Sequence, residues 1–443
     1  MDRKTFEPYK LNSLDDLRAA IETLNAEIPI SEDMSVFAKP HMIGDRRLDN
    51  SLLVHPMEGF DGRFSGAPGE LTWRRYERFT AGGASVVWFE AVAVCRDGRT
   101  SPNQLMLCKE TLDDYKRLCD RLHEVNPNAL LVCQLTHSGR FSKPDGKPAP
   151  VVVHRNPRLD AKFNIPEDYP LVTDDTLDRI KEDFMSCSRL AVEAGFDSLD
   201  VKSCHFYLMS EFLSGYEREG KYGGSYENRT RFMREVFAEA AREGGSKTVM
   251  ASRYSPYDHI AYPHGFGVDR EDFEKFDFSE SIRLLGELQA MGLKLIDLTM
   301  SSPYFEPHIN RPNNRCEYTP PEHPLVGVER LIKGTAEMKK AFPDIIFTTA
   351  GMSYLRDLAP YVMAGCLKEG INDLAGFGRM AFAYPDFAKD LLTKGALDRK
   401  KCCITCGKCT ELMRAGKSAG CPVKDGEVYL PLLREIPKYS VKN

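Results

Sequence analysis

The chain has 443 residues, of which 42% are hydrophobic and 28% are charged, and its net charge is −5. A chain of this length can bury a large core without disulfides, and its balanced charge gives no electrostatic reason to expect nucleic acid or an anionic membrane as a partner. Residues 1–7 carry charges and no apolar stretch, and no later run approaches the roughly 20 apolar residues of a membrane span, so we expect a cytoplasmic protein without a signal peptide.

Short apolar or β-branched runs alternate with longer amphipathic segments through most of the chain. Several of these runs are too continuously apolar for a sheet with one face in water, and they are typical of parallel strands buried on both faces. The predicted strands are residues 51–57, 85–94, 130–137, 198–205, 249–256, 293–300, 345–351 and 374–380.

The segments between these strands carry apolar residues at helical spacing. Helices are predicted at residues 69–82, 177–194, 228–242, 278–291, 328–342 and 354–368. Several end in glycine, which adopts the left-handed cap conformation at little cost. Eight β–α repeats in series predict an α/β protein with a (β/α)8 TIM barrel. A doubly wound sheet is the alternative, because strand order cannot be read from a sequence.

We expect three parts in the chain. Residues 1–35 are predicted to be a helical lead-in, residues 36–395 the barrel, and residues 396–443 a C-terminal segment with a metal site and a tail. At the start of the barrel, residues 36–47 have the pattern of a hairpin that could close its floor.

Five of the thirteen cysteines lie within twenty positions, at residues 402–421. The spacing Cys403-x2-Cys406-x2-Cys409-x11-Cys421 places three thiolates on one loop and a fourth farther on, which is how four-thiolate iron–sulfur sites are assembled. We therefore predict a [4Fe–4S] cluster. A zinc site and free thiols are alternatives, although structural zinc sites usually have two separated C-x2-C pairs. Cys402 is a second choice for the first ligand.

Polar and small residues gather where the predicted strands end, which is where barrels place their active sites. A flavin needs hydrogen bonds to its pyrimidine edge, a cation beside N1 and C2=O, and backbone groups with an arginine for its phosphate. The strand ends and the loops after them supply these types as Pro56, Met57, Glu58, Ala91, Gln134, Lys202, His205, Tyr207, Arg253, Tyr304, Gly351, Gly378 and Arg379. His55 is interpreted as a structural residue.

Four segments resemble a known family, the Old Yellow Enzyme-like flavoproteins. They are residues 132–140 (VCQLTHSGR), 206–213 (FYLMSEFL), 222–229 (YGGSYENR) and 376–379 (GFGR). The cysteine cluster resembles that of the iron–sulfur branch, which contains 2,4-dienoyl-CoA reductase and trimethylamine dehydrogenase. The resemblance covers roughly residues 36–425 and implies an FMN-dependent NADH:flavin oxidoreductase.

The resemblance implies a set of flavin contacts. Gln134 would bond the pyrimidine edge, and Arg253 would lie beside N1 and stabilise reduced FMN. Pro56, Met57 and Ala91 would pack against or bond the isoalloxazine ring. The residues expected at the phosphate are Gly351, Gly378 and Arg379. Glu58 stands where relatives commonly have a Thr or Cys that tunes the flavin, so its role is open.

The resemblance also implies roles in catalysis. Tyr207 would protonate the substrate Cα after hydride moves from flavin N5 to Cβ, since an unperturbed tyrosine keeps its proton up to a pKa near 10. Lys202 and His205 stand where many relatives have a His/His or His/Asn pair that grips the substrate carbonyl oxygen. Tyr304, at the position of a His in dienoyl-CoA reductases, and His308 are candidates for substrate contact. Phe206 replaces a usual Gly.

No G-x-G-x-x-G fingerprint follows the cluster, so we expect no FAD. FMN would then receive electrons from NAD(P)H directly, or through the cluster from a separate flavoprotein or ferredoxin. The leading hypothesis is an ene-reductase for an enoyl thioester, a steroid or bile-acid enone, or a tetrapyrrole methine bridge. The alternatives are an amine dehydrogenase, which resembles trimethylamine dehydrogenase and passes electrons through the cluster to a partner, and a non-catalytic electron carrier or redox sensor. Assembly into a homo-oligomer is left open.

Overall fold

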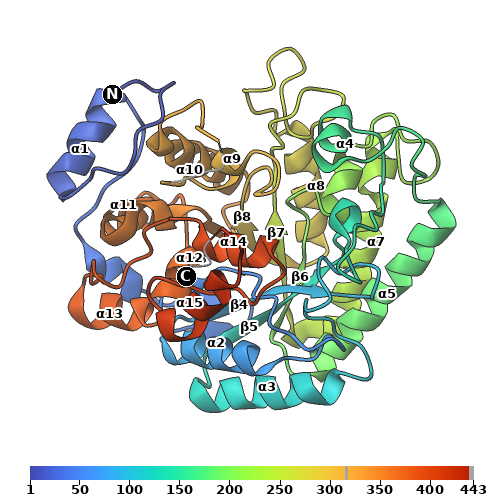
Figure 1. The fold of residues 1–443 in the computed structure, drawn as a ribbon, viewed down its shortest axis with the longest axis horizontal. Coiled ribbons are helices and arrows are strands. Elements are labelled where there is room, and N and C mark those ends of the chain that lie inside the picture. The colour runs from blue at the N-terminus through green and yellow to red at the C-terminus, as the bar shows by residue number, and fades with distance from the viewer. Residues whose placement is uncertain (315–317, 439–443) are drawn as a thin grey trace.

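Eight parallel strands run in consecutive order around a barrel in the computed structural model, which describes residues 1–314 and 318–438 (Figure 1). The strands are β3 (Leu52–Val54), β4 (Val86–Ala93), β5 (Leu130–Thr136), β6 (Ser198–Val201), β7 (Val249–Tyr254), β8 (Leu293–Leu298), β9 (Ile346–Thr349) and β10 (Ala375–Phe377). β10 pairs with β3, and a parallel bridge between Thr348 and Leu374 joins β9 to β10. The predicted (β/α)8 barrel is confirmed, and the doubly wound alternative is wrong.

A helix follows each strand and covers the outside of the barrel. These helices are α2 (Glu70–Ala81), α3 (Leu112–Val125), α5 (Asp174–Glu193), α7 (Tyr226–Gly244), α8 (Ser279–Ala290), α10 (Pro324–Ala341), α11 (Ala359–Lys368) and α13 (Phe387–Lys394). The helix predicted from residue 354 begins only at Ala359, because a 3-10 segment (Met352–Leu358) precedes it and Arg356 has φ 53° there. Each helix buries one apolar face against the strands.

A hairpin closes the N-terminal end of the barrel. It consists of β1 (His41–Ile43) and β2 (Arg46–Leu48), which pair antiparallel around Gly44 with φ +59°. Ile43 and Leu48 belong to the apolar cluster that fills the barrel interior, together with inward-facing residues such as Trp88 and Val132. The C-terminal ends of the strands are therefore the end of the barrel that remains available for a site.

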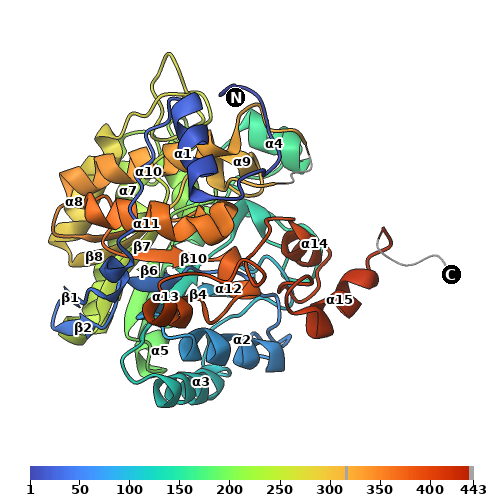
Figure 2. The ribbon, with the colours of Figure 1, turned by 90° about the vertical axis from the view of Figure 1, so that its left-hand side faces the viewer.

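Short helices in the loops cover that open end. They are α4 (Pro157–Phe163), α6 (Leu208–Glu211), α9 (Pro307–Asn310), α12 (Arg379–Ala383), α14 (Lys408–Arg414) and α15 (Gly426–Arg434). Figure 2 shows the hairpin and the α14–α15 segment at opposite sides of the barrel. Arg74 and Arg78 of α2 hold this segment through Asp425, at 2.7 and 2.6 Å. The lead-in contains α1 (Leu14–Thr23). Within the described residues, every helix is too short or too polar to span a membrane.

Candidate active site and a neighbouring cysteine-lined cavity

A cavity of about 850 Å³, including its part open to solvent, lies at the C-terminal end of the strands. Twelve of the residues singled out from the sequence line it: Pro56, Met57, Glu58, Ala91, Gln134, Lys202, His205, Arg253, Tyr304, Gly351, Gly378 and Arg379. Eight further lining residues were not assigned to the site from the sequence: His55, Pro303, Asn310, Arg311, Ala350, Ser353, Thr410 and Met413. The structure thus brings residues from the ends of all eight strands, or from the segments that follow them, to one place, and α14 adds two more.

Gln134 enters the cavity from β5 with its amide held in one orientation. Its Nε2 donates to Asp200 Oδ2 at 2.6 Å, so its Oε1 is the atom left for a ligand. Asp200, on β6, also accepts from Trp88 Nε1 at 2.8 Å and from the Arg253 backbone N–H at 2.7 Å. Burial raises the pKa of Asp200 to about 6, and these three hydrogen bonds oppose that rise. An acceptor held in this way suits the N3–H of a flavin pyrimidine.

Arg253, on β7, supplies a cation to the same cavity. Its Nη1 donates to Pro56 O at 2.9 Å, and its Nε lies 3.2 Å from the carboxylate of Asp297 on β8. His55 Nδ1 lies 3.1 Å from the same carboxylate. Although burial opposes ionisation, Arg253 and His55 hold the pKa of Asp297 below its usual range. His55, expected to be structural, therefore lines the cavity and helps to position Arg253.

The opposite end of the cavity is built to receive an anion. Gly351 has φ +98°, which favours glycine, and a Cβ on Gly378 would lie 2.9 Å from Met57 Sδ. Within the described part of the chain, Arg379 and Arg311 contact only neutral acceptors: Arg379 contacts Asn313 and Pro312, and Arg311 contacts Thr410. Burial, with Arg379 nearby, lowers the pKa of Arg311 to about 10. Arg379 is buried and Arg311 is half-buried, and two such cations without a paired acid among the described residues fit a phosphate.

Lys202 and His205 lie where a substrate oxygen could reach both. Lys202 is buried and its Nζ lies 3.8 Å from the centre of the Tyr207 ring. Burial lowers the pKa of Lys202, and burial together with Arg253 and Lys202 lowers that of His205 well below its usual range. His205 Nε2 is buried and has no hydrogen-bond partner among the described residues. A neutral imidazole and a buried ammonium can both donate to an oxygen that gains charge.

Tyr207 lies immediately behind the cavity wall. Its hydroxyl donates to Glu58 Oε1 at 2.9 Å and lies 3.1 Å from the Tyr304 hydroxyl. Among the described residues, those that line the cavity include Glu58 and Tyr304 but not Tyr207. Burial and the neighbouring Glu58 raise the pKa values of both tyrosines. Phe206, the replacement for a usual Gly, has φ 58°, the conformation that glycine adopts without strain.

His308 lies in the connection between β8 and α10. It belongs to the short helix α9, is 6% exposed, and its Nδ1 lies 2.5 Å from the Tyr318 hydroxyl. The described residues that line the cavity include its neighbours Asn310 and Arg311 but not His308 itself. A substrate contact at this position stays a prediction.

Four cysteines line a second, smaller cavity of about 370 Å³ between the barrel and α14. They are Cys403, Cys406, Cys409 and Cys421, the four ligands predicted from the spacing. Cys402 is buried instead beside Asp398, and its thiol donates to the Asp398 carbonyl at 3.4 Å. The donor set is that of a four-thiolate cluster, and the residue left out is the one ranked second.

One arginine joins the two cavities. Arg379 lines both, and Thr410 and Met413 of α14, the helix that carries Cys409, line the larger cavity. Burial raises the pKa of Cys409, and the nearby Arg311 and Arg379 oppose that rise and so favour the thiolate form that a metal ligand needs. A cluster in the smaller cavity would thus lie against the anion-binding end of the larger one.

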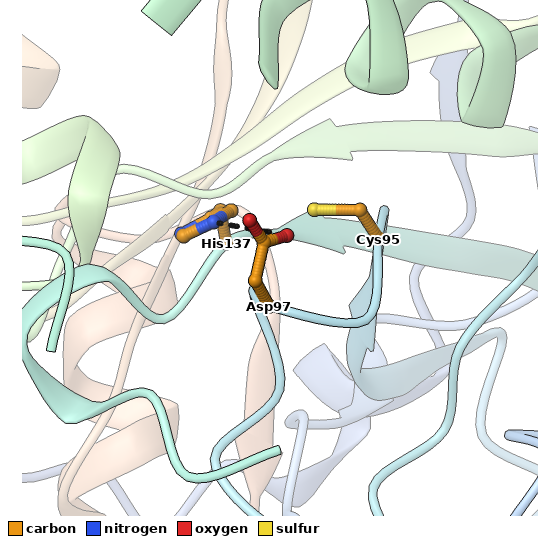
Figure 3. A group of neighbouring side chains, drawn as sticks. All are labelled: Cys95, Asp97 and His137. Atoms are coloured by element: carbon orange, nitrogen blue, oxygen red, sulfur yellow. Dashed lines mark ion pairs between the residues drawn. The ribbon is translucent and has the colours of Figure 1, made fainter. Parts of the chain in front are cut away.

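A third group of possible metal ligands, Cys95, Asp97 and His137, lies outside both cavities (Figure 3). Their ligand atoms lie within 4.8 Å of one another. However, His137 Nδ1 accepts a hydrogen bond from the Gly139 N–H at 3.0 Å, so the ring proton is on Nε2, which faces Asp97 at 4.0 Å. Histidines that bind metals normally donate through their second nitrogen. The group is therefore better explained as a structural contact between two loops.

The sequence matches the profile of a family described as NADH:flavin oxidoreductase / NADH oxidase, over residues 36–396. A relative from rice (Oryza sativa subsp. japonica), 12-oxophytodienoate reductase 1, is 27% identical over 304 residues, which cover 66% of this chain and 69% of the rice protein. The match to the family includes more than half of the chain and therefore establishes membership.

Solved structures show the same fold. A complex of 2-naphthoyl-CoA reductase with 2-naphthoyl-CoA has a TM-score of 0.71 at 18% identity, covering 88% of this chain and 57% of that chain. Histamine dehydrogenase from Rhizobium sp. 4-9 has a TM-score of 0.66 at 20% identity, covering 88% of this chain and 52% of that chain. The present chain thus spans just over half the length of either. At these identities the likeness concerns the fold alone.

Proposed function

The chain belongs to the NADH:flavin oxidoreductase / NADH oxidase family, and from this premise we propose that it reduces an activated C=C bond of an α,β-unsaturated carbonyl compound. The observation that carries the proposal is that two donors for a carbonyl oxygen line one cavity together with Tyr304, whose hydroxyl lies 3.1 Å from that of Tyr207 behind the wall. When bound, FMN would supply the two electrons of the reduction, and a [4Fe–4S] cluster would supply a one-electron route to it.

The FMN contacts proposed are those that the geometry favours. Gln134 accepts at the pyrimidine edge, because Asp200 occupies its amide nitrogen. Arg253 would place a fixed cation beside N1, and Asp297 and the Pro56 carbonyl hold its guanidinium. Pro56, Met57 and Ala91 line the cavity where the ring would lie, and Gly351, Gly378 and Arg379 would receive the phosphate. Arg311, missed in the sequence, is a second phosphate cation.

Lys202 and His205 would hold the substrate carbonyl oxygen. Both face the cavity, and His205 Nε2 is free to donate. An enolate oxygen develops negative charge as the β-carbon is reduced, so donors placed on it stabilise the transition state more than the ground state. Tyr207 would then supply the proton for Cα, with Tyr304 as the hydroxyl that connects it to the cavity.

Cys403, Cys406, Cys409 and Cys421 would hold the cluster, and Arg379 would lie between it and FMN. This arrangement supports electron entry from a protein donor, a flavoprotein or a ferredoxin, as an alternative to direct reduction by NADH or NADPH. The substrate class proposed is an enone or an enoyl thioester.

An anaerobic titration tests the proposal. The purified protein is mixed with NADH, NADPH or a reduced ferredoxin in turn, and a panel of enones and enoyl thioesters follows. We expect the flavin absorbance to bleach with a donor and to return with an enone. A second candidate function, amine dehydrogenation, is favoured by the cysteine-lined cavity beside the barrel; bleaching by tertiary amines but by none of the three donors would favour it over the reductase.

A further inference from the structure

Glu58, Tyr207 and Tyr304 form a continuous hydrogen-bond chain from three different strand ends. Glu58 lies after β3, Tyr207 after β6 and Tyr304 after β8. The Tyr207 hydroxyl donates to Glu58 Oε1 at 2.9 Å, and the Tyr207 and Tyr304 oxygens are 3.1 Å apart. Of the two tyrosines, Tyr304 is the one that lines the cavity. We propose that this chain is a proton relay in which Glu58 is the proton reservoir, and that the protonation state of Glu58 sets the direction of the chain. The inference rests on the proposed function.

When Glu58 is ionised, the chain runs inward. Each hydroxyl carries one proton and a carboxylate can only accept, so the Tyr207 proton points at Glu58 Oε1. Tyr304 must then donate to the Tyr207 oxygen, since Tyr207 has no second proton to give. In this state Tyr304 presents only lone pairs to the cavity, so it cannot protonate a carbon atom there.

Protonation of Glu58 reverses the chain. The carboxylic acid donates to the Tyr207 oxygen, Tyr207 donates to the Tyr304 oxygen, and the Tyr304 O–H points into the cavity. As Cα takes the Tyr304 proton, Tyr304 takes that of Tyr207, and Tyr207 takes that of Glu58. The enolate and the carboxylic acid become a saturated carbonyl product and a carboxylate. Neither tyrosine is left ionised, which matters because burial raises the pKa values of both.

The groups that face Glu58 and its burial affect the charge of its carboxyl group in opposite directions. Lys202, after β6, and Arg253, on β7, favour the carboxylate, as do the hydroxyls of Tyr207 and Thr100, the latter at 3.4 Å. Burial disfavours the carboxylate and is the largest of these effects, so the pKa of Glu58 is raised overall. A raised pKa keeps the acid form populated at higher pH than for an ordinary carboxyl group. The relay is therefore lost as pH rises through that pKa.

Stopped-flow reoxidation of the reduced holoenzyme tests the relay. Two oxidants are compared between pH 5 and 9: an enone, which requires protonation at carbon, and a quinone, which does not. Wild type should lose the enone rate about tenfold per pH unit above the pKa of Glu58 and keep the quinone rate. Glu58→Gln can still donate from its amide to Tyr207 but has no proton to release. We expect this variant to slow reoxidation by the enone about 10²–10⁴-fold. The rate of that reaction should also no longer depend on pH.

Two further variants separate the relay from its alternatives. Glu58→Asp keeps the acid and should recover part of the enone rate, and Glu110→Gln, an exposed carboxyl outside the site, should match wild type. If Glu58 protonated the substrate directly, Tyr207→Phe would leave the enone rate unchanged. If Glu58→Gln kept the wild-type rate and pH profile, the reservoir would be excluded.

A second readout does not depend on turnover. Infrared difference spectra between pH values should show a buried carboxylic acid band that is absent from Glu58→Gln and shifted in Tyr207→Phe. A wild-type enzyme that is reoxidised by quinone but by no enone would overturn the proposed function and not the relay, which these spectra still test. Absence of the band across the pH range would overturn the relay.

Discussion

Gln134 Nε2 donates to Asp200 Oδ2 across 2.6 Å, from strand β5 to its neighbour β6. The pair fixes which atom of the amide faces the cavity. Asp200 accepts three N–H groups, and an asparagine there could satisfy them only in part, because its own NH₂ would oppose one of them. We expect Asp200→Asn to weaken FMN binding about 5- to 30-fold, the equivalent of ~1–2 kcal/mol.

Fluorescence titration of the flavin-free protein with FMN measures this effect. Asp258→Asn is the matched control, because Asp258 is also buried but does not line the cavity. An FMN affinity that is equal in Asp200→Asn and wild type would mean that Gln134 does not depend on Asp200 for its orientation.

Asp200 also predicts a pH dependence of stability. Its pKa is about 6 in the fold against 3.8 for the unperturbed group, so the folded protein binds more protons between these values. Stability therefore falls as pH rises through this window. Because Asp200→Asn does not titrate, the stability of wild type relative to the variant should decrease by roughly 1–1.5 kcal/mol from pH 5 to 7. Urea unfolding at three pH values measures the difference, and a constant difference would contradict the raised pKa.

Arg253 is predicted to set the flavin potential. Loss of the cation beside N1 removes stabilisation of the reduced, anionic flavin, so Arg253→Met should lower the reduction potential by about 30 mV for each ~1.4 kcal/mol lost, or weaken FMN binding. Asp297 partly neutralises the same cation at 3.2 Å, so Asp297→Asn should shift the potential in the opposite direction. Spectroelectrochemistry measures the flavin reduction potential of each variant and so checks the direction of both shifts. Equal potentials and equal FMN affinities in all three proteins would place Arg253 away from the flavin.

The cysteine assignments make a second pair of variants informative. Cys406→Ser should lose the cluster, because one missing thiolate opens a corner, whereas Cys402→Ser should retain it, because the Cys402 thiol points to the Asp398 carbonyl. Anaerobically purified protein should contain iron and acid-labile sulfide at about four per flavin. One zinc per chain without iron would contradict the cluster proposal. Loss of iron from Cys402→Ser would mean that Cys402, and not Cys403, is the first ligand.

The barrel could be predicted because its strands are continuous apolar runs separated by helical patterns. Helix α3 was missed although Tyr115, Leu118, Cys119 and Leu122, all buried, have helical spacing. That signal was present in the sequence. Most of the cavity lining could also be predicted from the polar and small residues at the strand ends, because the C-terminal ends of parallel barrel strands lie at the same end of the barrel.

The partners of the lining residues could not be predicted. Asp200 and Asp297 are single acids inside buried strands, and only the closed barrel shows which cations and amides they contact. The position of Tyr207 depends on backbone detail as well. β6 ends at Val201 rather than at residue 205, and His205 and Phe206 both have positive φ, so the chain turns and Tyr207 lies behind the wall. Counting residues along an extended strand cannot foresee that turn.

Tyr207→Phe keeps the ring under Lys202 and removes the hydroxyl that joins Glu58 to Tyr304. Tyr304 would keep its own proton but lose its supply, and protonation of Cα from Tyr304 alone would leave a buried tyrosinate, which burial disfavours. Reduction of the flavin by its donor should remain nearly unchanged, since that step needs no proton from this pair.

Reoxidation by an enone should slow by about 10²–10⁴, the usual scale for a lost general acid, while quinone reoxidation is spared. Tyr304→Phe should show the same split, because it removes the hydroxyl of the tyrosine that lines the cavity. If stopped-flow traces gave equal rates of reoxidation by the enone in wild type and Tyr207→Phe, Tyr207 would have only a packing role. If reoxidation by the enone were slow in Tyr304→Phe but not in Tyr207→Phe, Tyr304 would be the acid and would draw its proton from solvent.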